Sequence, residues 1–84
     1  MINLNKEMTI LIDNVIDLKK FNNIAMTFRC EIDDISGRYT VDGRSLMGLL
    51  SLDLSKPVQI KYRTEYHDIA KLYFTKFEVK ENAN

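Results

Sequence analysis

The sequence predicts a two-layer α+β domain in which a four-stranded, largely antiparallel sheet is covered on one face by three helices. Two segments, over about residues 6–12 and 58–63, carry apolar residues at every second position, which is typical of half-buried strands. Two others, over about 14–27 and from Tyr66 onward, carry them at helical spacing. A hairpin and a short helix between these segments complete the order βαββαβα.

The first strand and the first helix meet at Asp13 and Asn14. The inward residues of the strand are Met8, Ile10 and Ile12. Asp13 and Asn14 end it, since both side chains can accept hydrogen bonds from the free amides of a helix start. Helical spacing follows for Leu18, Phe21, Ala25 and Phe28. We therefore expect the first helix to span about residues 14–27.

A hairpin is expected next. Its first strand alternates Cys30 and Ile32 with charged neighbours, so Cys30 is interpreted as a small buried hydrophobe and not as a catalytic thiol. A turn at Ser36-Gly37 leads into a third strand that ends at Asp42-Gly43. Because the alternation slips at Ile35, we expect a bulge or an irregular loop between the two strands.

The second half of the chain begins with Ser45, which is placed to cap a short helix over residues 46–53. In that helix Leu49 and Leu52 are expected to face the core. Residues 58–63 form the clearest half-buried strand of the sequence, with a basic solvent face.

The third helix is expected to start near Tyr66, with His67 as a solvated or capping residue at its beginning. Its apolar side should face inward. The residues of that side are Ile69, Leu72, Tyr73, Lys76 and Phe77. A polar tail covers residues 78–84.

Composition narrows the function classes. The 84 residues make a single domain. The 12 basic and 12 acidic residues cancel, so no net positive charge attracts the chain to nucleic acid or acidic lipid. The longest apolar stretch, residues 46–52, is too short to span a membrane and no signal-peptide pattern is present, so we expect a cytoplasmic location. His67 has no partner at metal-ligand spacing, and no catalytic constellation is visible. We expect no metal, no cofactor and no enzymatic activity.

One segment carries a family resemblance. Residues 41–54 read V-D-G-R-S-L-M-G-L-L-S-L-D-L, which resembles the signature around the regulatory serine of the HPr phosphocarrier family, commonly V-N-x-K-S-I-M-G-x-M-S-L. The outright matches are Val41, Ser45, Met47, Gly48, Ser51 and Leu52. The motif covers only about a sixth of the chain, but the predicted order of elements is also that of the family. The resemblance implies an HPr-like open-faced sandwich over residues 1–84.

The family's other signature, G-L-H-A-R-P-A, is not kept. The corresponding residues read I-D-N-V-I-D-L, with Asn14 at the reactive histidine, Ile16 at the arginine that helps to hold phosphate and Asp17 at the proline. The nitrogen of an asparagine amide is conjugated into its carbonyl and cannot replace an imidazole as phosphate carrier. Asp13 or Asp17 could in principle form an acyl phosphate, but acidic residues in a first helical turn more often complement the helix dipole.

The resemblance implies a regulatory role centred on Ser45, the position that a dedicated kinase phosphorylates in HPr proteins of many Gram-positive bacteria. The docking residues would be Leu46, Met47, Leu50 and Ile16, used by enzyme I, the kinase or a LacI-type repressor. The chain is similar to the catabolite-repression HPr-like proteins, which also lack the histidine. Two alternatives remain: a phosphocarrier of the sugar phosphotransferase system that uses an unconventional site, and an unmodified interaction module in which Ser45 is only a helix cap.

Overall fold

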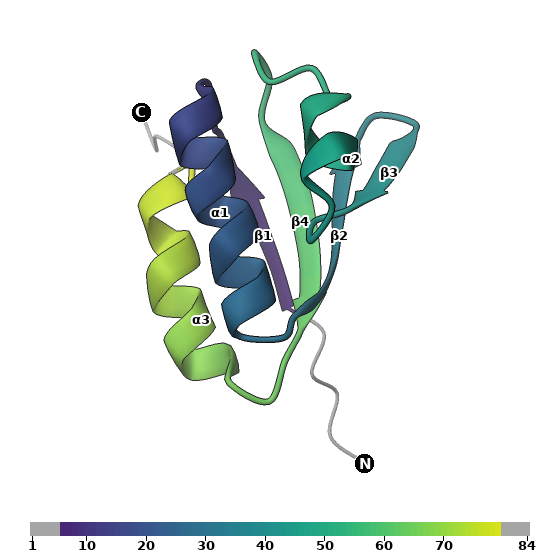
Figure 1. Cartoon of the computed structure of the whole chain (residues 1–84). Coiled ribbons are helices and arrows are strands. Elements are labelled where there is room, and N and C mark those ends of the chain that lie inside the picture. Colours follow the sequence, from purple (N-terminus) through teal and green to yellow (C-terminus); the bar gives the residue numbers. More distant parts are fainter. Residues whose placement is uncertain (1–5, 80–84) are drawn as a thin grey trace, which may run out of the picture.

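The computed structural model describes residues 6–79, which form a four-stranded antiparallel sheet and three α-helices (Figure 1). In chain order the elements are β1 (Lys6–Ile10), α1 (Val15–Thr27), β2 (Glu31–Ser36), β3 (Tyr39–Asp42), α2 (Leu46–Leu50), β4 (Val58–Arg63), α3 (His67–Phe74) and the 3-10 turn η1 (Thr75–Phe77). The helices lie on one face of the sheet, with α1 between α3 and α2 (Figure 1). Within residues 6–79, no helix combines the length and the apolar character that a membrane crossing requires.

The sheet has the strand order β1-β4-β2-β3, so the last strand lies between the first two. In this register Met8 pairs with Ile60, and Ile32 with Tyr62, and these four side chains are buried toward the helices. The residues between them, such as Lys61, are exposed. One face of the sheet is therefore apolar and buried and the other is exposed to solvent, as the alternation predicts.

The helices complete the core with aromatic side chains. Phe21 of α1 packs against Phe74 of α3, with ring centroids 5.2 Å apart, and against Phe77, at 6.1 Å. Phe74 also meets Tyr62 of β4 at 5.1 Å. Leu18, Phe21 and Ala25 are buried, which confirms the inward face predicted for the first helix.

The bulge predicted between β2 and β3 is absent from the described hairpin. The pairing runs without a break from Asp33↔Asp42 to Ser36↔Tyr39, and a two-residue loop begins at Gly37, whose φ of +60° suits a glycine. The alternation slips at Ile35 because the inward position is taken by Asp34, which is buried. A carboxyl group fills a place that the pattern reserves for an apolar side chain.

The inward face predicted for α3 is wrong in four of its five residues. Ile69, Leu72, Tyr73 and Lys76 are exposed, and the buried residues of α3 are Ala70 and Phe74. Phe77 is buried as predicted. The apolar residues of α3 form two stripes, and the one that faces the core is continued by Phe77 of η1, so that Phe74 and Phe77 both pack against Phe21.

Three element boundaries also differ from the predicted ones. β1 ends at Ile10, two residues early, although Ile12 stays buried. The hairpin's first strand begins at Glu31, so the buried Cys30 lies just before it. α2 ends at Leu50, where Ser51 caps it, and does not reach Asp53.

Candidate functional site

The candidate site is the start of α2, where the hairpin passes into the helix. Ser45 is the N-cap: its Oγ accepts a hydrogen bond from the Gly48 amide at 3.1 Å, as the sequence predicts. Its own amide donates to the Asp42 carbonyl at 2.9 Å, which ties the helix start to the end of β3. Ser45 is exposed, so its hydroxyl is open to a modifying enzyme.

A cation and an anion stand beside Ser45. Arg44 donates from Nε and Nη2 to the two carboxylate oxygens of Asp42, both at 3.3 Å, and its amide donates to Asp42 Oδ1 at 2.8 Å. These hydrogen bonds lower the pKa of the Asp42 carboxyl. Both side chains are about half exposed, so solvent weakens the ion pair and the guanidinium can turn to another anion at little cost.

The short helix α2 divides its apolar residues between core and surface. Leu49 is buried, whereas Met47 is 79% exposed and Leu50 43% exposed. Leu46 and Leu52 are partly buried and pack against the core. The inward position predicted for Leu49 and the outward positions predicted for Met47 and Leu50 are confirmed, but Leu46 is only in part a surface residue.

At the start of α1, Asn14 is a structural cap. Its Oδ1 accepts from the Asp17 amide at 2.8 Å, and its Nδ2 donates to carboxylate oxygens of Asp13 and Asp17, both at 3.1 Å. Two carboxylates therefore flank the amide, and Lys20 approaches only Asp17, at 4.0 Å. An incoming phosphoryl group would meet negative charge here. Ile16 projects into solvent, 69% exposed.

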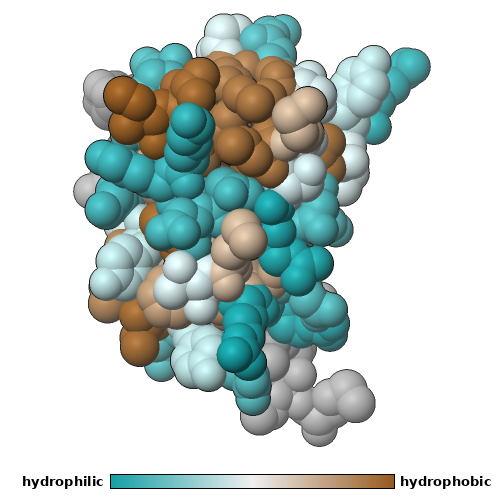
Figure 2. Space-filling view, viewed as in Figure 1, coloured by the Kyte–Doolittle hydropathy of each residue, from teal (hydrophilic) through white to brown (hydrophobic). Residues whose placement is uncertain are grey.

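The start of α1 and the helix α2 lie at the same end of the molecule (Figure 1). Leu18 of α1 and Leu49 of α2 line one small pocket, and Asn22 Nδ2 donates to the Gly43 carbonyl at 3.4 Å. Figure 2 shows apolar side chains gathered over this end. We call this surface the α1–α2 face; its exposed apolar residues are Val15, Ile16, Met47 and Leu50. Val15 is not among the docking residues that the resemblance implies.

The chain's one histidine lies far from this face. His67 begins α3, and the neighbouring Tyr66 packs against Phe28, at the end of α1, with ring centroids 6.4 Å apart. Because α1 has 13 residues, roughly 20 Å of helix separate this end from Asn14. His67 Nε2 lies 3.1 Å from Asp68 Oδ1. The imidazole therefore cannot take part in chemistry at the start of α1.

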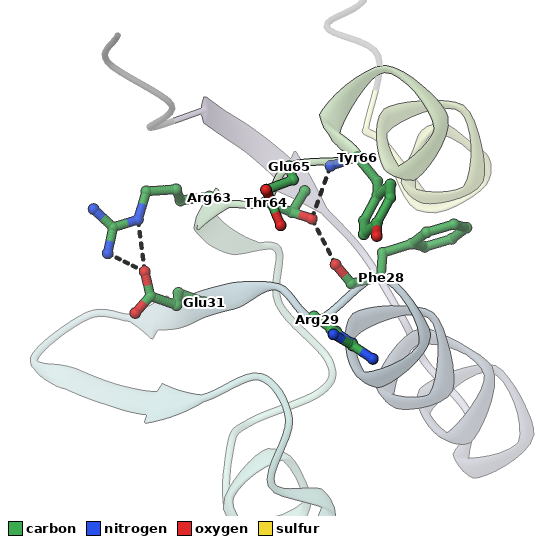
Figure 3. A pocket seen from close by; sticks show the side chains of 7 residues that line it. All are labelled: Phe28, Arg29, Glu31, Arg63, Thr64, Glu65 and Tyr66. Carbon is green, nitrogen blue, oxygen red and sulfur yellow. Dashed lines mark hydrogen bonds and ion pairs between the residues drawn. The ribbon is translucent and has the colours of Figure 1, made fainter. Parts of the chain in front are cut away.

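A pocket of about 340 Å³ lies at this opposite end of α1 (Figure 3). Thr64 Oγ1 donates to the Phe28 carbonyl at 2.5 Å and accepts from the Tyr66 amide at 3.1 Å, which joins the end of α1 to the start of α3. An exposed ion pair, Arg63 with Glu31, stands at its rim. These contacts fasten a junction between elements and supply no activated nucleophile.

The remaining reactive groups do not form a site. Cys30 is buried, and desolvation by that burial raises the pKa of its thiol. Between residues 6 and 79, no three His, Cys, Asp or Glu side chains are placed to hold a metal ion. Neither a scan against models of protein families nor a search of curated proteins finds a match to this chain.

Proposed function

We propose that the chain is an HPr-like regulatory protein that lacks the phosphoacceptor histidine and is switched by phosphorylation of Ser45. The observation that carries the proposal is the exposed hydroxyl of Ser45 two residues before Met47, the most exposed apolar side chain among the described residues. A modifiable residue and an adaptable apolar contact thus share one short helix. The protein acts by binding other proteins and catalyses no reaction itself.

The architecture supports membership of this family. The elements follow one another as strand, helix, strand, strand, helix, strand, helix, and the helices cover one face of an antiparallel sheet. This is the arrangement that the resemblance over residues 41–54 implies. The setting would be the sugar phosphotransferase system in the cytoplasm, where ATP and the serine kinase are present.

A phosphate on Ser45 would alter the surface and keep the fold. It carries nearly two negative charges at pH 7, and at a helix N-terminus the free amides and the dipole favour it by about 0.3–1 kcal/mol. Arg44 is beside it and can leave the exposed Asp42 carboxylate for the phosphate. The neighbouring Met47 and Leu50 stay exposed, so a partner could read anion and apolar contact together.

The partner is a protein: the kinase, an enzyme I-like protein or a transcriptional regulator of the LacI type. No direct contact with nucleic acid or membrane is proposed, because the net charge is zero. Ile16 and Val15 extend the docking surface toward the start of α1, on the same end of the molecule as α2.

The main alternative is a phosphocarrier with an unconventional acceptor. An acyl phosphate on Asp13 or Asp17 would form beside a second carboxylate, with Lys20 as the nearby cation. Such a site repels the group that it has to accept. The other alternative is an unmodified interaction module, in which Ser45 only caps α2.

Two parallel reactions test the proposal: one with enzyme I and phosphoenolpyruvate, the other with the HPr serine kinase and ATP, each followed by mass spectrometry of the peptides. We expect phosphate on Ser45 from the kinase alone, and none in Ser45→Ala. Ser51→Ala, which removes the other serine that bonds to Gly48, is the matched control and should be modified normally. Acid-labile phosphate from the enzyme I reaction would establish the carrier instead, and no phosphate in either reaction would leave the unmodified module.

A further inference from the structure

The outer side of α3 carries an apolar stripe that the fold does not bury. Leu72 is 74% exposed, and Ile69 and Tyr73 are about half exposed. They are spaced three and four residues apart, so they lie on one side of the helix. Figure 2 shows apolar side chains at the lower left edge of the molecule, over α3. The stripe lies apart from the α1–α2 face, since α1 stands between α3 and α2 (Figure 1).

The residues of this stripe take no part in the hydrophobic core. α3 already packs Ala70 and Phe74 inward, and η1 adds Phe77. A surface helix normally keeps its outer side polar, and contiguous exposed apolar side chains mark a contact with another molecule.

The charges along α3 suit a second copy of the same helix. Glu65 lies two residues before α3, and Asp68 lies in its first turn and projects almost fully into solvent, whereas Lys71 lies in its last turn and Lys76 follows in η1. When two copies of a helix pack antiparallel, the beginning of each meets the end of the other. Acidic and basic ends then face each other twice, whereas a parallel pair would bring like charges together.

We propose that this chain forms a homodimer through α3, with the two helices antiparallel about a two-fold axis. Ile69 of each copy then meets Leu72 of the other, and Glu65 meets Lys76. The contact is isologous, so it closes at two copies and does not extend into a fibre. Tyr73, whose ring lies 6.0 Å from the Lys76 ammonium, packs at the edge of the contact.

The size of the contact sets its strength. α3 has 8 residues and is about 12 Å long, so one side of it supplies less than the roughly 800 Å² per partner of a standard stable interface. The dimer is therefore weak and forms in the micromolar to millimolar range. It leaves Ser45 and the α1–α2 face free, and it does not depend on the proposed regulatory function.

Sedimentation velocity of the full chain from micromolar to millimolar concentration tests the proposal. We expect the wild type to shift from monomer to dimer, and Leu72→Glu to raise the dissociation constant at least about tenfold. Leu72 is exposed, so this variant should keep the wild-type circular dichroism spectrum. Met47→Glu places the same charge on the α1–α2 face and should dimerise like the wild type.

A charge exchange tests whether the two copies of α3 pack antiparallel. Glu65→Lys and Lys76→Glu should each weaken the dimer several-fold, and the double exchange should restore it, because the two positions face each other only in the antiparallel pair. A monomer at every concentration would overturn the proposal. So would loss of the dimer in Met47→Glu but not in Leu72→Glu, or a double exchange that fails to restore association.

Discussion

The carboxyl of Asp34 lies in the core next to α2. It is 2% exposed, and its Oδ1 has no hydrogen-bond partner among residues 6–79. Desolvation by burial, with smaller contributions from the charges of Asp33 and Asp42, raises its pKa to about 8. A Cβ at residue 43 would lie 2.5 Å from Oδ1, so Gly43 leaves the space that this carboxyl occupies. The group is protonated in the folded chain at neutral pH.

Stability should therefore fall as pH rises. In the unfolded chain Asp34 loses its proton near the ordinary carboxyl pKa of 3.8, but in the folded chain only near pH 8. The folded state binds the extra proton between these values, so the free energy of unfolding falls by at most about 1.4 kcal/mol per pH unit in that window. Urea denaturation at a series of pH values measures this slope.

Asp34→Asn is the variant that isolates the effect. Its side chain has a similar size and does not ionise, so its unfolding free energy should vary less between about pH 5 and pH 8 than that of the wild type. Asp33→Asn changes the adjacent, exposed carboxyl of the same strand and should keep most of the wild-type slope. Equal slopes for the wild type and Asp34→Asn would show that Asp34 is ionised in the folded chain.

Ser45 caps α2, so phosphorylation must leave the helix start intact. Its Oγ accepts from the Gly48 amide, so Ser45→Ala should lower the free energy of unfolding by about 1 kcal/mol. Ser45→Asp keeps an acceptor and adds a negative charge at the helix N-terminus, so it should retain most of the wild-type stability. Urea denaturation of both variants checks this, and a strongly destabilised Ser45→Asp would contradict a fold that tolerates phosphoserine.

Substitutions on the two sides of α2 should differ sharply in their effect on the free energy of unfolding. Leu49 is buried, so Leu49→Ala should cost about 2–5 kcal/mol. Met47→Ala, two residues earlier in the same helix, should change the free energy of unfolding by no more than about 0.5 kcal/mol. Chemical denaturation compares the two directly. A large loss in Met47→Ala would mean that this side chain serves the fold and not a partner.

Elements with a strong local pattern could be predicted closely from the sequence. β4 spans Val58–Arg63 as expected, and α1 begins directly after its cap, Asn14. The inward side of α3 could not be predicted, because the helix has two apolar stripes and only the packing against Phe21 decides which of them faces the core. The unbroken pairing of the hairpin could not be predicted either, because Asp34 occupies a core position that alternation assigns to an apolar residue, and the slip at Ile35 is its only sign in the sequence.

The candidate site was predictable only in part. The cap at Ser45 and the exposure of Met47 follow from the local sequence and the resemblance. The closeness of α2 to the start of α1 depends on how the helices cross the sheet, and no short sequence motif predicts that. For the same reason the pairing of Arg44 with Asp42, and the pocket beside Thr64, became visible only in the folded chain.

Across the molecule, the three surface features lie apart. The α1–α2 face is at one end, the pocket beside Thr64 is at the other, and the outer stripe of α3 lies along a side (Figures 1 and 2). A dimer through α3 would therefore present two α1–α2 faces to partners. Modification of Ser45 and association through α3 should be energetically independent, because distant sites without shared contacts act additively.

Amide-resolved NMR of the chain before and after treatment with the HPr serine kinase and ATP tests the role of Ser45 most directly. The signals of the amides from Arg44 to Leu50 should move most, above all that of Gly48, which donates to Ser45 Oγ. The signals of the sheet should stay in place. An unchanged spectrum, or the largest changes around Asn14 at the start of α1, would contradict the account.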